Sequence, residues 1–227
     1  MPAPLSATIA CVFDAYGTLF DFLSASKRCR DALGDKAEAL GQLWRTRQLE
    51  YSWLRSLMGT HADFWQVTGE ALDFAMASLG IRDAALRDRL MDLFLHIEAF
   101  PDARRVLEAL RRAKRPAIIL SNGSPEMLNA AMKSAGVESL LDAALSVESA
   151  GIYKPHRSVY ELVTRHLNIP PERVCFVSSN GWDAAGAAHF GFAAVWANRG
   201  GAPRENLPGG VAAEIRDLDA LPKLLGL

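Results

Sequence analysis

The sequence is poor in cysteine, lacks long apolar runs and carries almost no net charge. Its 3 cysteines, Cys11, Cys29 and Cys175, are too few and too widely spaced in 227 residues for a disulfide or zinc framework. We expect buried free thiols, as in a protein of the reducing cytoplasm. No apolar run approaches the roughly 20 residues that span a bilayer. The formal net charge of −1 favours neither nucleic acid nor an anionic membrane as a partner.

The amino-terminal stretch MPAPLSATIACVF lacks the basic region of a secretory signal, and its apolar part runs directly into Asp14. We therefore expect no signal peptide and a cytoplasmic location. Neither a membrane nor a nucleic acid is expected as a partner.

Apolar residues, by contrast, are plentiful, at 50% of the chain. This is enough for one large domain, or for a domain that carries a smaller inserted one. Short apolar runs alternate with helical patterns, which predicts the α/β class with a doubly wound parallel sheet. The predicted strands are TIACVF (8–13), AIIL (117–120), VCFV (174–177) and AAVWA (193–197), with AALSV (143–147) as a weaker fifth.

Residues 21–99 contain helical periodicity and no convincing strand. A crossover between parallel strands needs far fewer residues, so we predict an inserted helical domain over 21–99, with residues 1–20 and 100–227 forming the core. In the helix expected near 37–58, one apolar stripe is formed by Leu40, Leu43, Trp44, Tyr51, Leu54 and Met58. Arg45, Leu49 and Trp53 form a second face, which predicts packing against a second surface, such as a cleft over the sheet.

Polar side chains follow the predicted strands at the point where each strand ends. Because the carboxyl ends of parallel strands share one edge of a sheet, where ligands bind, these side chains are expected to converge. They would bring two carboxylates and one ammonium together under a lid that carries Arg45. The groups are Asp14, Tyr16, Gly17 and Thr18; Ser121, Asn122 and Gly123; Lys154 and Pro155; and Ser178, Ser179, Asn180, Trp182 and Asp183.

The order of these motifs, D-x-Y-G-T-L, S-N-G-S, K-P and S-S-N-x-W-D, resembles the haloacid dehalogenase superfamily and, more narrowly, the L-2-haloacid dehalogenases. The resemblance covers nearly the whole chain, including QLWRTRQLEYSWLRSLM (42–58). It implies a Rossmann-like core with a helical cap inserted after the first strand, and a homodimer formed partly through the cap.

The residues that depart from the superfamily's phosphatases bear on the chemistry. Phosphatases that resemble this chain carry a second aspartate two residues after the nucleophile, where Tyr16 stands here, and an acid that binds magnesium in the fourth motif, where Ser178 and Ser179 stand. A departing halide needs no proton, and magnesium needs hard oxygen ligands that are depleted here. We therefore predict carbon–halogen cleavage with no metal and no cofactor.

The resemblance and the chemistry together imply a mechanism. Asp14 attacks C2 of a 2-haloalkanoate, halide departs, and water then hydrolyses the aspartyl ester to a D-2-hydroxy acid. Lys154 is expected to hold Asp14 ionised, and Arg45 to receive the halide. Thr18 is expected as a donor, Ser121 for the substrate carboxylate, and Asn122 and Trp182 for the halide. Asp183 is expected to orient Lys154 or the hydrolytic water, with Asn180 and Ser178 as further polar supports, and the resemblance also implies a role for Tyr160. The expected apolar walls are Tyr16, Leu49, Phe64 and Trp182.

Two alternatives remain open at this point. One is a magnesium-dependent phosphatase of the same superfamily, and the other is a binding module that keeps the fold without turnover. The five histidines form no triad or metal-binding spacing, and no G-x-S-x-G elbow is present, which argues against an α/β-hydrolase. The expected partners are thus a small 2-haloacid and the halide that leaves it.

Overall fold

The computed structural model describes residues 4–227, so the first three residues of the predicted core segment 1–20 lie outside the described residues. Its centre is a six-stranded sheet in the order β3-β2-β1-β4-β5-β6, and each neighbouring pair is parallel. The α/β class and the parallel sheet are confirmed. The strands are β1 (Ala10–Phe13), β2 (Ala117–Ser121), β3 (Ala143–Ser146), β4 (Val174–Ser178), β5 (Ala193–Ala197) and β6 (Ala213–Ile215).

The five predicted strands are all present, and the short edge strand β6 is an addition that the sequence pattern did not indicate. β6 has three residues, of which only Ile215 is buried, so it lacks the apolar run that marks the others. β1, β2, β4 and β5 are buried along their whole length, as expected for strands covered on both faces. The three cysteines are free and buried, as predicted.

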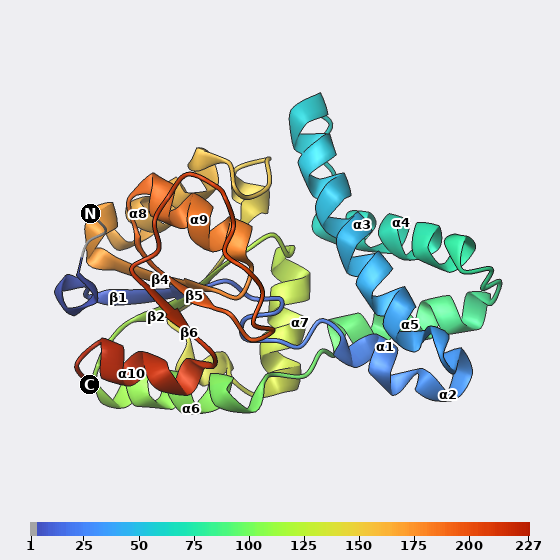
Figure 1. Ribbon diagram of the computed structural model, residues 1–227, viewed down its shortest axis with the longest axis horizontal. Helices are drawn as coiled ribbons and strands as arrows, with labels where there is room; N and C mark the ends of the chain where they lie inside the picture. The colour runs from blue at the N-terminus through green and yellow to red at the C-terminus, as the bar shows by residue number, and fades with distance from the viewer. Residues whose placement is uncertain (1–3) are drawn as a thin grey trace.

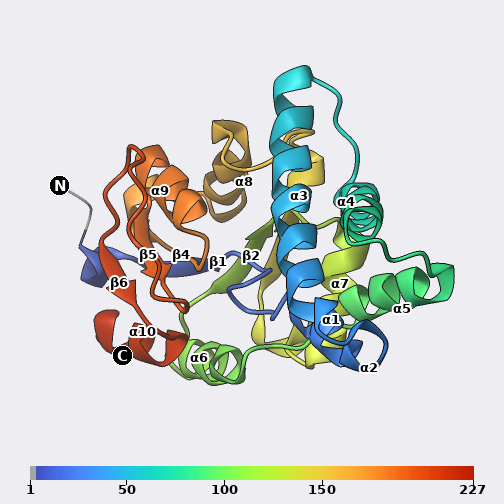
Figure 2. The same cartoon turned by 45° about the vertical axis from the view of Figure 1, so that its right-hand side comes forward.

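Helices cover both faces of the sheet (Figures 1 and 2), with α8 and α9 on one side and α6 and α10 on the other. α7 begins at the predicted signal, where the hydroxyl of Ser124 accepts a hydrogen bond from the amide of Met127. The core helices are α6 (Pro101–Arg112), α7 (Pro125–Ala135), α8 (Arg157–Leu167), α9 (Gly181–Phe190) and α10 (Leu221–Leu224). Short 3₁₀ helices are Leu5–Ala7, Glu138–Leu140, Val147–Ser149, Pro171–Arg173 and Leu218–Ala220.

Residues 21–99 contain five α-helices and no strand, as the periodicity predicts, and these helices lie beside the sheet layer (Figure 1). The two connections to the core run next to each other, because the amide of Phe100 donates to the carbonyl of Leu19 at 2.9 Å. The helices are α1 (Ser24–Arg28), α2 (Arg30–Leu33), α3 (Lys36–Met58), α4 (Phe64–Ser78) and α5 (Ala84–Leu95). Within residues 4–227, none of the helices combines the length and the hydropathy that crossing a membrane requires.

The apolar stripe predicted on α3 is correct only for its first half. Leu40 and Trp44 are buried against the other helices, but Leu54 and Met58 are 51% and 71% exposed. The reason is visible in Figure 1, where the carboxyl-terminal end of α3 projects beyond α4. The second face is placed as predicted: Arg45 and Trp53 are half-buried and contact the core.

Candidate active site

The site lies at the carboxyl end of the central strands. Phe13 of β1 pairs in register with Ile119 of β2 and Val177 of β4, so the residues that follow these strands emerge at one edge. After Asp14 the chain turns sharply at Gly17, whose φ of 91° is in the region that favours glycine. A Cβ at Gly17 would also lie 2.9 Å from the hydroxyl of Ser179. This turn brings Thr18 back toward the carboxylate.

The two oxygens of the Asp14 carboxylate have different surroundings. Oδ2 accepts hydrogen bonds from the hydroxyl of Thr18 at 3.0 Å, the amide group of Asn180 at 2.8 Å and the hydroxyl of Ser178 at 3.3 Å. Oδ1 accepts one, from the ammonium of Lys154 at 3.1 Å. The side chain of Asp14 is 9% exposed. Oδ2 is thus heavily hydrogen-bonded, and Oδ1 keeps lone-pair capacity for another partner.

Lys154 bridges two buried carboxylates. Its Nζ lies 3.1 Å from Asp14 Oδ1 and 2.9 Å from Asp183 Oδ2, and the Lys154 and Asp183 side chains are 1% and 0% exposed. Tyr160 donates its hydroxyl to Asp183 Oδ1 at 2.8 Å, so both oxygens of Asp183 are occupied. Burial raises the pKa of Asp183, Lys154 opposes that shift and Asp14 adds to it, leaving the pKa above its ordinary value. Tyr160 and Asp183 therefore fix the position of the Lys154 ammonium.

The charge of Lys154 leads to a prediction for alkaline pH. Burial lowers the pKa of this ammonium, but the two carboxylates of Asp14 and Asp183 raise it by more than that. The pKa of Lys154 therefore lies above its ordinary value of 10.5. Because the folded pKa exceeds the unfolded one, this group's stabilisation is complete below pH 10.5 and is lost as the pH rises through the folded pKa.

We therefore expect the difference in unfolding free energy between wild type and Lys154→Met to stay constant from about pH 8 to about pH 10 and to shrink only at higher pH. Urea denaturation across this range measures it. A difference that already shrinks below pH 10 would mean that the folded pKa of Lys154 is lowered, contrary to the geometry.

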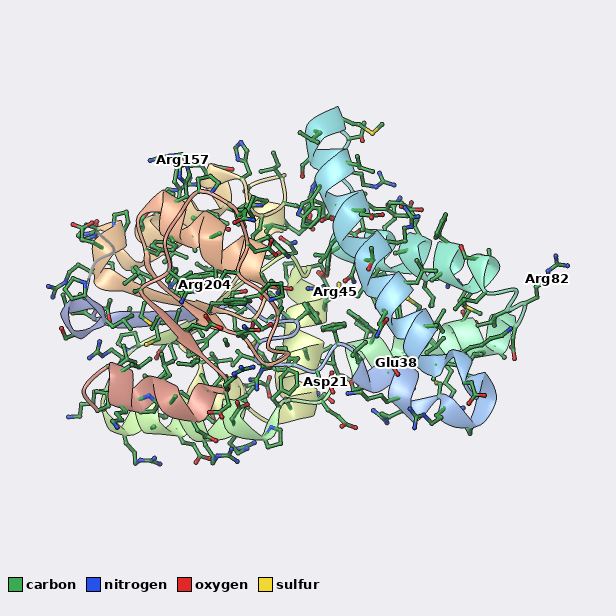
Figure 3. The ribbon with its side chains drawn as sticks, in the orientation of Figure 1. Asp21, Glu38, Arg45, Arg82, Arg157 and Arg204 are labelled. Atoms are coloured by element: carbon green, nitrogen blue, oxygen red, sulfur yellow. The ribbon has the colours of Figure 1, made fainter. Side chains whose placement is uncertain are left out.

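Arg45 reaches the same edge from α3. Figure 3 shows it between α3 and the core, and its Nη2 lies 3.3 Å from Asn180 Oδ1 and 3.5 Å from the carbonyl of Tyr16. Its guanidinium also lies over the ring of Phe22, at 4.9 Å from the ring centroid. Within residues 4–227 it forms no ion pair with a carboxylate, and burial lowers its pKa although Asp14 partly opposes that shift. A half-buried cation whose partners are neutral is suited to receive an anion.

Aromatic side chains surround the turn after Asp14. Tyr16 stacks on Phe94 at a centroid distance of 5.2 Å and packs on Phe64 at 6.2 Å. Burial raises the pKa of Tyr16, so its phenol stays neutral. Phe64 also packs against Tyr153 at 5.8 Å. These rings form a dry wall beside the carboxylate.

A cavity of about 510 Å³ lies between the end of α3 and the segment before α8, and it reaches Lys154. Trp53 of α3 and Trp182 of α9 meet edge to face nearby, with ring centroids 5.2 Å apart. Leu49 is half-buried, one turn before Trp53 on the same helix. The cavity is lined by Trp53, Ser56, Leu57, Ile152, Tyr153, Lys154, Pro155 and His156.

Not every predicted residue contacts the carboxylate directly. Ser121 is buried, and its hydroxyl accepts a hydrogen bond from the amide of Gly123 at 3.0 Å. Asn122 Oδ1 accepts from the amide of Lys154 at 3.1 Å, so it orients the backbone that carries the ammonium. Direct contacts with Asp14 are made by Thr18, Lys154, Ser178 and Asn180, and Asp183 and Tyr160 act through Lys154. Arg45 contacts Asn180 and the carbonyl of Tyr16, Phe64 packs on Tyr16, and Trp182 packs on Trp53. Within residues 4–227, neither Ser121 nor Leu49 hydrogen-bonds through its side chain to Asp14.

The prediction gave no role to two residues that hold the site in place. Ser179 donates its amide to the hydroxyl oxygen of Thr18 at 2.8 Å, and it lay within the fourth motif. Gln48 accepts a hydrogen bond from Arg45 at 2.8 Å. Its spacing of three residues after Arg45 on a helix was a signal for that contact, because such residues are neighbours on the helix surface.

Comparison with known proteins identifies the family. Residues 10–191 match the family model described as haloacid dehalogenase-like hydrolase. (S)-2-haloacid dehalogenase 4A of Burkholderia cepacia is 48% identical over 95% of this chain and 94% of its own length. A dehalogenase crystal structure covers 97% of this chain and 98% of its own, with a TM-score of 0.95 and 47% identity. An L-2-haloacid dehalogenase from Xanthobacter autotrophicus, with chloropropionic acid covalently bound, gives a TM-score of 0.87 at 37% identity, over 96% and 98% of the two chains.

The fold and the site thus define a hydrolase, and the chain belongs to the haloacid dehalogenase-like hydrolase family. Within that family it is an enzyme of the (S)-2-haloacid dehalogenase group, to which several relatives at 40–48% identity over most of the chain belong.

Proposed function

We propose that this enzyme hydrolyses L-2-haloalkanoic acids to D-2-hydroxy acids and halide through an ester of Asp14, without a metal ion or another cofactor. The observation that carries the proposal is the position of Arg45, a half-buried cation whose hydrogen-bond partners within residues 4–227 are neutral, next to Asn180, which itself donates to Asp14. An anionic substrate would supply the missing negative charge. The names of the relatives, and the covalently bound chloropropionic acid in the Xanthobacter autotrophicus protein, support the same reaction.

In the first step, Oδ1 of Asp14 attacks C2 of the substrate from the side opposite the halogen. Oδ1 is the candidate nucleophile because it has one donor, whereas Oδ2 has three. A new C–O bond forms, the carbon–halogen bond breaks, and its electron pair leaves with the halide. A single inversion at C2 converts the L-haloacid to the D-hydroxy acid.

In the second step, water attacks the carbonyl carbon of the ester. Oδ2 is then the carbonyl oxygen, and negative charge develops on it in the tetrahedral intermediate. The donors Thr18, Ser178 and Asn180 already point at this atom, so they form an oxyanion hole that needs no rearrangement. The hydroxy acid leaves with its oxygen taken from Asp14, a proton is released, and the carboxylate is restored.

The roles of the remaining residues follow from the negative charge that Asp14 and the anionic substrate bring together. Two unit charges about 4 Å apart repel by about 4 kcal/mol at an effective dielectric near 20, so the approach of an anionic substrate to Asp14 must be offset. Lys154 offsets the charge of the nucleophile, and Arg45 is positioned to receive the departing halide with Asn122 and Trp182. Ser121 would hold the substrate carboxylate. Tyr16, Leu49, Phe64 and Trp182 would exclude water from the alkyl group.

The residues around Asp14 support a reaction without metal. Ser178 and Ser179 stand where the superfamily's phosphatases carry the acid that binds magnesium, so neither position offers a carboxylate ligand. Tyr16 replaces an acid that would protonate an alkoxide leaving group. These substitutions favour halide displacement over the phosphatase alternative.

We further propose that residues 21–99 act as the lid of a core formed by residues 1–20 and 100–227. Arg45 and Trp53 support this, because both reach from α3 to the core. A cytoplasmic homodimer stays a prediction, and sedimentation equilibrium of the purified protein would test its oligomeric state.

The proposal is tested by incubating the protein with L-2-chloropropionate and excess EDTA and measuring chloride. We expect chloride release that EDTA does not reduce, and D-lactate as the product. D-2-chloropropionate is the matched control, and it should release little chloride. If no chloride appears, and a phosphate ester is hydrolysed when magnesium is added, the phosphatase alternative is correct.

A further inference from the structure

Arg45 is held by a buried chain of hydrogen bonds that none of its proposed chemistry requires. Gln48, three residues later on α3, accepts from Nη1 of Arg45 through Oε1 at 2.8 Å. Its Nε2 donates to the hydroxyl of Thr68 on α4 at 2.7 Å. Gln48 is 1% exposed and Thr68 is 0% exposed. A buried amide with partners on both ends is rigidly oriented, since each lost bond would leave a buried polar group unsatisfied.

The direction of every hydrogen bond from Arg45 to Thr68 is determined by the contact of Thr68 with Phe64. The hydroxyl of Thr68 lies 2.6 Å from the backbone carbonyl of Phe64, which can only accept. The single hydroxyl proton of Thr68 is therefore used there, and its oxygen must accept from Gln48. The Nε2 of Gln48 then faces Thr68, and its Oε1 must face Arg45. The backbone of α4 thus fixes the orientation of the guanidinium on α3.

A second hydrogen bond joins α3 and α4 at Thr68. The indole Nε1 of Trp44 donates to the backbone carbonyl of Thr68 at 2.8 Å, and Trp44 is buried. Trp44 and Gln48 are four residues apart on α3, so they lie on the same side of the helix. Any rotation of α3 that moved Arg45 would break both contacts with Thr68.

Charge explains why an amide suits this position. The partners of Arg45 are all neutral: Gln48 Oε1, Asn180 Oδ1 and the carbonyl of Tyr16. A glutamate at position 48 would have nearly the same shape, but it would form an ion pair with the guanidinium and would lose the N–H that Thr68 accepts. Because a buried ion pair interacts strongly, it would neutralise the cation before an anion arrives.

We propose that Gln48 is a positioning residue, which aims Arg45 at the nucleophile and keeps its positive charge available for the departing halide. The inference rests on the proposed function and adds a residue to it. Gln48 is expected to influence two properties together: the rate of carbon–halogen cleavage and the affinity for free halide as an inhibitor.

The test compares Gln48→Glu with wild type in halide release and in inhibition by added bromide. We expect Gln48→Glu to lower kcat/KM by about 100-fold, as loss of one charge-stabilising group does, and to raise the inhibition constant for bromide at least about tenfold. Gln42→Glu is the matched control, because Gln42 is an exposed glutamine on the same helix. It should behave like wild type in both measurements.

Variants of Thr68 separate orientation from stability. Thr68→Val removes the acceptor for Gln48 with little change of volume, and it should raise the inhibition constant for bromide, as Gln48→Glu does. Thr68→Ser keeps the hydroxyl, and its inhibition constant for bromide should equal that of wild type. Thermal unfolding of each variant reports stability independently.

The outcomes are distinguishable. A wild type that releases no halide from any 2-haloacid refutes the proposed function. An active wild type, with Gln48→Glu unchanged in bromide inhibition, refutes the positioning role, even if the variant is less stable or slower.

Discussion

Replacing Asp14 with asparagine is expected to reduce halide release by at least about 10,000-fold in kcat, the scale of loss seen when a catalytic nucleophile is removed. The amide oxygen of asparagine is a poor nucleophile and cannot form the ester. Because Lys154 keeps its ion pair with Asp183 at 2.9 Å, the variant should remain folded. Chloride release from L-2-chloropropionate under saturating conditions measures the effect.

Asp88→Asn is the matched control, since the side chain of Asp88 is 80% exposed on α5, and its activity should equal that of wild type. Residual activity of Asp14→Asn above about 1% would contradict the assignment of the nucleophile.

Replacing Lys154 with methionine is expected to destabilise the protein by about 3–5 kcal/mol, as removal of one partner from a buried ion pair does. It would leave Asp14 and Asp183 facing each other without the cation between them. Halide release should also be lost, because no cation would offset the charge of the nucleophile when the anionic substrate approaches. Urea unfolding at neutral pH measures the loss of stability.

A second substitution separates the two effects. Lys154→Met combined with Asp183→Asn removes the like-charge pair, so it should recover much of the stability without recovering activity. Lys27→Met is the matched control, because the Lys27–Asp21 pair has a 58% exposed lysine and its loss should cost less than about 1 kcal/mol. Equal stability of Lys154→Met and Lys27→Met would contradict the bridging role.

The fold could be predicted from the sequence because its strong signals are local. The runs ACVF, AIIL, VCFV and AAVWA are continuous and apolar, and a strand covered on both faces needs that pattern. β6 was missed because an edge strand of three residues needs only one buried side chain. The exposed end of α3 was also missed, since Leu54 and Met58 continue the same periodicity, and the point where α3 extends past α4 determines where packing stops.

The site could be predicted as a group of residues but not as a geometry. Asp14 follows β1, Ser178 ends the neighbouring strand β4, and Asn180 comes two residues later, so the edge of the sheet brings them together whatever the side-chain details. The division of donors between Oδ1 and Oδ2 of Asp14 depends on rotamers and on the turn at Gly17, which sequence patterns do not specify. The partnership of Gln48 with Thr68 depends on how α3 and α4 cross, which neither helix's own sequence determines.

The most direct test of the account is a single turnover in ¹⁸O-water with enzyme in excess over L-2-chloropropionate. Water attacks the ester carbonyl in the proposed mechanism, so the label should enter the carboxylate of Asp14, and the first hydroxy acid formed should contain no label. Mass spectrometry of the product and of the peptide that contains Asp14 measures both. Label in the first-turnover product, with Asp14 unlabelled, would show that water displaces the halogen directly and would contradict the ester mechanism.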